Sequence, residues 1–224
     1  MTETMRRASH TELTQINDRI SWLPATSTPF CCDIVFIKSK DEQGEFTWIF
    51  DVGVGPAAAS AINAVQGRKK IVISHFHPDH ILNLPFVKYD ELYVSKYTKK
   101  YTRIGTEVSG ILDFGDVKIL PMPSSHSKGS LALFADGYGF LGDAAFCKYK
   151  SIHHLYNPQI LYEMIKFMEE SDCKYFCLDH EQNFIQNRQP VIALYKDIYS
   201  RHKDSDGQEV KWINVDDYFP TGGE

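Results

Sequence analysis

The chain has 224 residues, a formal net charge of −5, and a composition of 43% hydrophobic, 13% aromatic and 24% charged residues. This composition is ordinary for a globular protein and excludes both a disordered chain and a small disulfide-stapled scaffold. The acidic balance disfavours broad electrostatic binding to nucleic acid or to an anionic membrane, so we expect no partner of either kind.

The cysteines and the apolar segments bear on the compartment. The five cysteines are odd in number and two are adjacent, Cys31 and Cys32, which is not the pattern of a disulfide framework. Residues 1–18 are polar and lack the apolar core of a secretory signal, and no apolar stretch is long enough to span a bilayer. We expect a cytoplasmic protein with a polar tail at 1–18 and a single domain at 19–224, ordered from about Ile20.

The first half of the chain predicts strands followed by a helix. Asp33–Ile37 and Phe46–Phe50 are rich in β-branched and aromatic residues, and the turn-prone segment Lys40–Gly44 between them favours an antiparallel hairpin. Pro56 then begins an Ala-rich helix that runs to about Val65. The elements expected next are a strand at Ile71–Ser74, a helix from Pro78 towards Tyr89 and a strand at Glu91–Ser95.

The second half predicts a run of short strands and two helices. Gly115-Asp116 and Asp136-Gly137 are hairpin signals between the strands. Asn157 is a good N-cap for a helix with apolar residues at helical spacing. The strands are expected at Ile111–Phe114, Val117–Leu120, Leu131–Phe134, Tyr138–Leu141 and Lys174–Leu178, the last helix at Pro190 to about Arg201, and an irregular end from Lys203. The pattern favours an α/β fold with mixed sheets and helices outside, without fixing the topology.

One short segment carries the strongest chemical signal. Three imidazoles and a carboxylate fall within six residues, at His75, His77, Asp79 and His80. Side chains two apart on an extended chain share a face, so His75 and His77 can reach one metal ion together. Pro78 favours a turn, after which Asp79 and His80 can point to a second ion. These ligand types suit zinc in a hydrolytic site, whereas the competing interpretation is a solvated cluster on a loop.

The segment from His75 to His80 resembles the His-x-His-x-Asp-His signature of the metallo-β-lactamase superfamily, and the resemblance extends over about residues 34–180. The family's other motif residues follow in order near predicted strand ends, at Asp51, His126, Asp143 and His180. The resemblance implies a four-layer αβ/βα sandwich, classed as α/β or, for its mixed sheets, α+β. It implies that His75, His77 and His126 hold one metal, that Asp79, His80 and His180 hold a second, that Asp143 bridges them, and that Asp51 orients a ligand histidine.

The same resemblance implies a hydrolase with two divalent metal ions, zinc in first place and manganese or iron as alternatives. Two adjacent ions lower the pKa of a shared water to roughly 7, and the hydroxide attacks a carbonyl carbon or a phosphorus. Asp79, which orients the hydroxide, and Asp143 are the expected catalytic carboxylates. The expected partner is a small-molecule substrate, namely an ester, lactone, thioester or phosphodiester. The sequence does not choose among these, and it does not fix the oligomeric state.

Other interpretations stay open. Taken alone, Asp51 and Asp143 are also typical of turns, His126 of a solvated loop, and His180 of a surface partner for Asp179. Within the superfamily, persulfide dioxygenases form an alternative class, because they keep nearly all these residues but use one iron held by the equivalents of His75, His126 and Asp143. A binding module without activity is disfavoured by the full ligand set.

A few further residues bear on the substrate. Lys128, His153 and His154 are candidate substrate contacts, although a solvated lysine and a plain loop are the favoured interpretations. Enzymes of the family that destroy β-lactams usually lack a carboxylate at the place of Asp143, so we expect a general hydrolase branch. Acyl-homoserine lactonases carry a tyrosine where this chain has Phe146, and the residues that could replace it are Tyr138, Tyr149 and Tyr156.

Overall fold

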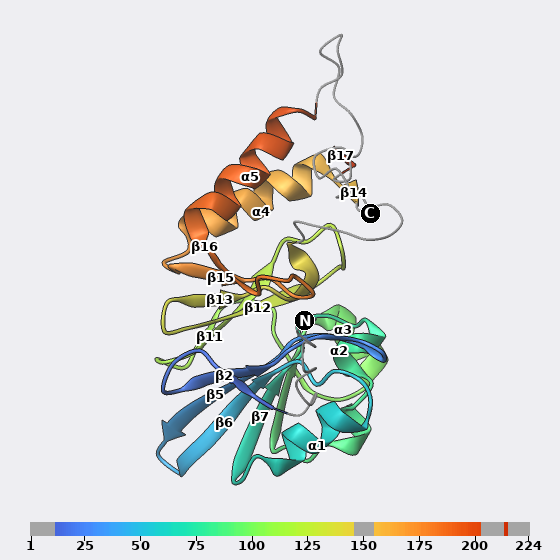
Figure 1. Cartoon of the computed structure of the whole chain (residues 1–224), viewed down its shortest axis with the longest axis vertical. Coiled ribbons are helices and arrows are strands. Elements are labelled where there is room, and N and C mark those ends of the chain that lie inside the picture. The colour runs from blue at the N-terminus through green and yellow to red at the C-terminus, as the bar shows by residue number, and fades with distance from the viewer. Residues whose placement is uncertain (1–11, 146–154, 203–212, 215–224) are drawn as a thin grey trace, which may run out of the picture.

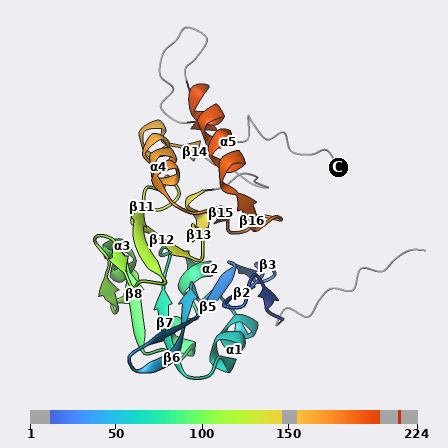
Figure 2. The same ribbon diagram turned by 90° about the vertical axis from the view of Figure 1, so that its left-hand side faces the viewer.

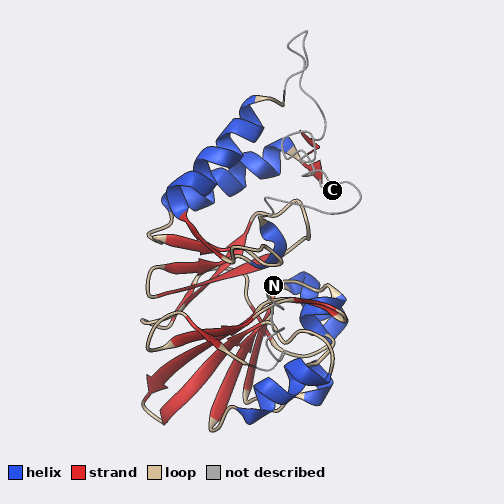
Figure 3. Ribbon diagram, viewed as in Figure 1, coloured by secondary structure: helices blue, strands red, loops and turns tan. Residues whose placement is uncertain are grey.

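The computed structural model describes residues 12–145, 155–202 and 213–214. Two sheets face each other, and helices lie on the outer side of each, as Figures 1 and 3 show. This arrangement confirms the expected α/β fold with mixed sheets and outer helices. Among the described helices, none combines the length and the apolar character that crossing a membrane requires.

The first sheet has seven strands in the order β1-β2-β5-β6-β7-β8-β9. Their bounds are β1 (Thr14–Gln15), β2 (Ile20–Leu23), β5 (Ile34–Asp41), β6 (Gly44–Phe50), β7 (Arg68–Val72), β8 (Glu91–Val94) and β9 (Thr106–Glu107). The predicted hairpin is confirmed, because β5 pairs antiparallel with β6, while β6 to β9 run parallel. The sheet includes β1, which pairs Thr14 with Trp22, so order begins upstream of the expected Ile20.

Strand β7 also begins earlier than predicted, at Arg68 and not at Ile71. The basic residues there are compatible with a buried strand because their charges have partners. Lys70 Nζ lies 3.1 Å from a Glu91 carboxylate oxygen and 3.5 Å from one of Asp41. The lysine stem can then pack in the sheet while the ammonium group stays paired.

Helices beside the first sheet agree only in part with the prediction. Helix α1 (Pro56–Ala64) is confirmed. The helix expected from Pro78 towards Tyr89 is wrong, since α2 ends at Ile81 and only a 3-10 turn, η1 (Leu84–Phe86), follows. Pro85 explains the break, because proline has no amide hydrogen for the helix and disfavours a helical residue before it.

Helix α3 (Lys96–Thr102) was not predicted, although its ends carry ordinary signals. The Ser95 side chain caps its first turn by accepting a hydrogen bond from the Thr98 amide. Arg103 ends the helix in the left-handed region, at φ 62°. The helix lies beside β8 at the edge of the first sheet (Figure 2).

The second sheet has six strands in the order β10-β11-β12-β13-β15-β16. Their bounds are β10 (Leu112–Asp113), β11 (Lys118–Met122), β12 (Ser130–Ala135), β13 (Tyr138–Phe140), β15 (Tyr175–Cys177) and β16 (Ile185–Asn187). Both predicted hairpins are confirmed, and their turns use Gly115 and Gly137 with positive φ. Two small sheets pair β3 (Thr26–Ser27) with β4 (Phe30–Cys31), and β14 (Leu155–Tyr156) with β17 (Ile213–Asn214).

Helices α4 (Pro158–Glu170) and α5 (Arg188–Ser200) cover the second sheet, and both were predicted. Asn157 caps α4 as expected, accepting hydrogen bonds from two backbone amides. Three apolar clusters fill the spaces between the four layers. One lies between α1 and the first sheet, one between the two sheets, and one between the second sheet and the α4–α5 pair. A rigid, fully packed sandwich therefore holds the loops at its edge.

Candidate metal centre

All seven predicted metal ligands lie together at one edge of the sandwich, on segments that follow strands of both sheets. The segment after β7 and helix α2 (Pro78–Ile81) carry four of them, and single residues follow β11, β13 and β15. The ligand atoms of His75, His77, His126 and Asp143 lie within 4.8 Å of one another, and those of Asp79, His80, His180 and Asp143 form a second such set. We call these the first and second donor groups. They share Asp143.

Asp51 holds His80 of the second donor group by the ring nitrogen that does not face the group. It follows β6 and adopts a left-handed backbone, at φ 64°. One carboxylate oxygen accepts a hydrogen bond from the Ser74 amide at 2.7 Å, and the other lies 2.8 Å from His80 Nδ1. Both side chains are 0% exposed. The contact matches the orienting role predicted for Asp51, because it leaves His80 Nε2 facing the donor group.

The other members of the second donor group contact each other directly. His180 Nε2 lies 3.1 Å from an Asp79 carboxylate oxygen, and His80 Nε2 lies 3.4 Å from the same oxygen. Burial works against ionisation of Asp79, but these two imidazoles outweigh it and hold the pKa below its usual range. Burial likewise opposes protonation of His80, but Asp51 and Asp143 keep its pKa well above the usual value. The pKa of His180 is raised too, because the Asp79 hydrogen bond outweighs burial.

The first donor group has the opposite electrostatics. Burial, with repulsion from the His80 cation, lowers the pKa of His75 well below its usual value. Burial also lowers the pKa of His77, and it lowers that of His126 to about 4. His126 Nε2 lies 2.8 Å from His77 Nδ1. These imidazoles are therefore neutral near pH 7, the form in which histidine binds a metal.

Asp143 sits between the two groups. Its Oδ2 lies 3.4 Å from Nε2 of His126, in the first group, and 3.4 Å from Nε2 of His80, in the second. Burial opposes its ionisation, but the His80 cation outweighs burial and lowers the pKa of Asp143. Nε2 of His75, Nε2 of His80 and Oδ1 of Asp143 are buried and lack a hydrogen-bond partner. Buried polar atoms normally have partners, so these three fit a place where cations complete the contacts.

Two buried carboxyl groups, which were not predicted, hold the His180 backbone. The His180 amide donates to Asp33 at 3.1 Å and to Asp179 at 3.2 Å, while the residue itself adopts φ 59°. Burial, with the nearby charge of Asp33, raises the pKa of Asp179 well above its usual range. The surface pair of His180 with Asp179 is thus wrong as an interpretation, because Asp179 is buried and binds backbone.

Comparisons with known proteins agree with this architecture. No family model and no curated protein matches the sequence. Among solved structures, a β-lactamase domain protein from Burkholderia ambifaria matches with a TM-score of 0.64 at 12% identity, over 88% of this chain and 79% of its own. An archaeal metallo-β-lactamase superfamily protein from Sulfolobus tokodaii matches with a TM-score of 0.54 at 17% identity, over 84% and 88%. This chain has the metallo-β-lactamase fold.

A variant of a flavo di-iron protein from Thermotoga maritima has a TM-score of 0.53 at 14% identity, over 84% of this chain and 63% of its own. The shared fold is the one that the resemblance of the motifs implied. At such identities the similarity defines the fold alone, and the reaction has to be argued from the site.

The candidate substrate contacts have different outcomes. Lys128 is exposed on the loop that carries His126. Tyr156 is fully buried against Tyr195, with ring centroids 5.7 Å apart, so it cannot supply the phenol of a lactonase. Tyr138 stacks on Tyr175 between strands. The remaining candidates, His153, His154 and Tyr149, lie outside the described residues, as does Phe146 at the position of the lactonase tyrosine.

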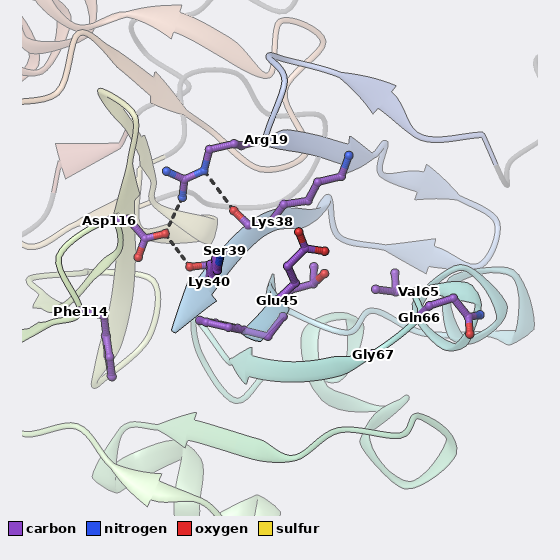
Figure 4. A pocket seen from close by; sticks show the side chains of 12 residues that line it. Arg19, Lys38, Ser39, Lys40, Glu45, Val65, Gln66, Gly67, Phe114 and Asp116 are labelled. Atoms are coloured by element: carbon purple, nitrogen blue, oxygen red, sulfur yellow. Dashed lines mark hydrogen bonds and ion pairs between the residues drawn. The ribbon is translucent and has the colours of Figure 1, made fainter. Parts of the chain in front are cut away.

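A surface hollow of about 830 Å³ lies elsewhere on the metallo-β-lactamase fold, at the opposite ends of the strands (Figure 4). Two of its charged residues, Arg19 and Asp116, form an ion pair with each other. The Arg19 guanidinium lies 2.6 Å from Asp116, which also accepts a hydrogen bond from Ser39 at 2.5 Å. None of the predicted site residues lines this hollow.

Proposed function

We propose that the protein is a metal-dependent hydrolase that uses two divalent ions, one in each donor group. The observation that carries the proposal is the convergence of buried imidazole and carboxylate atoms without hydrogen-bond partners on two adjacent points that share Asp143. A hydrophobic core gains nothing from such atoms, since an unpaired buried polar group costs about 1–3 kcal/mol.

The donor chemistry fits zinc, manganese or iron. His75, His77 and His126 would hold one ion, Asp79, His80 and His180 the other, and Asp143 would contact both. Nitrogen and carboxylate ligands without a described thiolate in either group favour zinc in first place. When bound, two such ions supply a water of lowered pKa and polarise the bond under attack.

The chain's own residues orient and hold protons around that chemistry. Asp79 remains ionised, so its carboxylate accepts a hydrogen bond from the attacking water and fixes its direction. Asp51 accepts the hydrogen on Nδ1 of His80, which keeps Nε2 free for a ligand bond. Asp143 places one carboxylate oxygen between the two groups. No serine or cysteine nucleophile is needed.

The proposed substrate is a small ester, lactone, thioester or phosphodiester. Each of these presents a carbonyl carbon or a phosphorus to the attacking water and an oxygen that a cation can polarise. The fold supports many reactions, so the bond type has to come from experiment.

The test is elemental analysis of protein purified without added metal, followed by a panel of the four substrate classes. We expect about two zinc or manganese ions per chain. A His75→Ala variant should lose metal and hydrolysis together, because His75 Nε2 belongs to the first donor group. His202→Ala is the matched control, since His202 is a buried histidine outside both groups.

Two other results of the metal analysis would contradict the proposal. About one iron per chain, with oxygen uptake on persulfides, would assign the alternative dioxygenase chemistry to His75, His126 and Asp143. A folded protein that neither contains metal nor takes it up on titration would refute the hydrolase.

A further inference from the structure

One face of helix α3 lies against both loops of the first donor group. Tyr97 and Tyr101 are four residues apart and so share a helical face. Tyr101 stacks on Phe76, with centroids 4.5 Å apart at 7°, and the Phe76 ring lies 5.1 Å from that of His77. The two tyrosines are 40% and 59% exposed, so their rings are only partly used by the fold.

Tyr97 reaches the other loop. A Cβ on Gly129 would lie 2.6 Å from Tyr97 Cδ2, so the ring packs directly on the backbone three residues after His126. The absence of a side chain at Gly129 is what permits this approach. The α3 face therefore joins the segments that carry His77 and His126.

Helix α3, its C-terminal residue Arg103 and the loop after His126 carry cations without acidic partners. Within the described part of the chain, none of them forms an ion pair with a carboxylate, in contrast to Arg19, Arg68 and Lys70, which do. These unpaired cations are Lys96, Lys99, Lys100, Arg103 and Lys128. Lys100 Nζ lies 5.2 Å from the Tyr97 ring centroid. In a chain of net charge −5, this is a local positive field beside the first donor group.

We propose that Phe76, Tyr97, Lys100, Tyr101 and Lys128 form a substrate-binding surface, the α3 shelf, for a flat ring that carries a negative charge. The inference rests on the proposed function, in which the donor groups act on the bond and the shelf holds the part that is not cleaved. Exposed aromatic rings stack on flat groups, and unpaired lysines attract anions. A nucleobase with a phosphate or an aromatic ring with a carboxylate supplies this chemistry.

Binding to the zinc-loaded protein, measured by calorimetry, separates the ring from the charge. The probes are AMP, adenosine and ribose 5-phosphate, with benzoate for the carboxylate source. Tyr101→Ala should weaken AMP and adenosine roughly tenfold, because an aromatic–base stack is lost, and leave ribose 5-phosphate unchanged. Lys100→Ala should weaken AMP and ribose 5-phosphate about two- to fivefold and leave adenosine unchanged. Any contact of the phosphate with zinc is the same in all variants, so it cancels from the ratio of the dissociation constants of a variant and the parent protein.

Helix α4 offers a matched control. Lys166 Nζ lies 4.4 Å from the ring of Tyr162, which is 42% exposed, so the pair repeats the arrangement on α3 away from the donor groups. Tyr162→Ala and Lys166→Ala should leave all four affinities unchanged. Lys100→Glu should weaken anions more than Lys100→Ala does, and thermal melting checks that each variant is folded.

The outcomes separate the shelf from the hydrolase. If Tyr101→Ala and Lys100→Glu bind every probe as the α4 controls do, the shelf is refuted. If the variants change the affinity for benzoate alone, the ligand of the shelf is an aromatic ring with a carboxylate and not a nucleobase with a phosphate. If the variants behave as expected but the protein hydrolyses no substrate class, the proposed function fails while the shelf stands.

Discussion

The two donor groups share one carboxylate but are built differently. In the second group, His80 is fully buried and held by Asp51, and the His180 backbone is held by Asp33 and Asp179. In the first group, His75 lies 3.0 Å from the Ser74 hydroxyl, and His126 Nε2 lies 2.8 Å from His77 Nδ1, so no carboxylate of the described residues is needed for these two contacts. The His126 side chain is 22% exposed. The second group is thus the anchored half, held by buried carboxyl groups, and the first is the more open half, whose segments lie beside α3.

Charge follows the same division. Around the second group, Asp51, Asp79 and Asp143 raise the pKa values of its two histidines. Around the first group burial dominates, and the pKa values of all three histidines fall. Under the proposed function, the anchored half would fix the geometry of the centre, and the open half would receive the substrate on the side of the α3 shelf.

The largest expected effect comes from Asp143, the residue common to both halves. Asp143→Asn keeps the shape but replaces a negative oxygen with an amide that donates hydrogens towards imidazoles. We expect both metals and all hydrolysis to be lost, beyond the about 10–100-fold cost of changing an outer carboxylate. Elemental analysis and the substrate panel measure this. If one metal remained with full affinity, the two halves would be independent.

Asp51→Asn tests the two donor groups separately, because Asp51 contacts a histidine of the second group. An asparagine tolerates the left-handed backbone and can still accept the Ser74 amide. Its NH₂ would donate to His80 Nδ1, which moves the imidazole proton to Nε2, the atom facing the donor group. We expect the second metal to bind about 10–100-fold more weakly and the first to change little.

The control for Asp51 is Asp113→Asn, an exposed acid 3.4 Å from Lys118. Metal titration of both variants and of the parent protein gives the comparison. Equal weakening of both metals in Asp51→Asn would mean that Asp51 supports the whole cluster and not one half.

The number of protons released on metal binding distinguishes the two donor groups without any mutation. With its pKa raised, His80 carries a proton in the metal-free protein near neutral pH, and a metal must displace it. The first-group histidines, with lowered pKa values, have no proton to lose there. The metal affinity of the second group should therefore rise with pH through the neutral range, while the metal affinity of the first group stays nearly constant.

Calorimetric zinc titrations in two buffers of different ionisation enthalpy count the released protons. A His77→Ala variant, which leaves the second group intact, assigns the steps. If the same number of protons were released when each zinc ion binds, the proposed difference in charge between the two donor groups would be contradicted.

The sequence was sufficient to name the candidate ligands that the structure brings together, because their chemistry is local. His75, His77 and His80 lie within one short segment, and Asp143 and His180 follow strands whose apolar residues are easily recognised. The ends of neighbouring strands meet at one edge, so residues distant in the chain could be placed together in advance. The hairpins were predictable for the same reason, since their turn glycines are adjacent to clear strands.

What the sequence did not reveal depends on contacts between distant segments. The pairing of Asp33 with Asp179 joins two sheets, and nothing in either local sequence marks it. Helix α3 is rich in lysine and tyrosine and reads as a solvated run, although Ser95 was a usable capping signal. The early end of α2 was predictable from Pro85, whose effect outweighs the apolar residues around it.

The smallest expected effect concerns Phe30, which stacks on His180 with centroids 4.4 Å apart and is 52% exposed. Such a pair contributes about 0.5–1.5 kcal/mol beyond burial, so Phe30→Ala should weaken the second metal by at most about tenfold. The effect is limited because the Asp33 and Asp179 carboxyl groups hold the His180 backbone without the ring. Metal titration beside Phe86→Ala, another exposed phenylalanine, measures it. A loss as large as that of Asp51→Asn would mean that an exposed ring and not the buried carboxyl groups positions His180, and the second group would then be no better anchored than the first.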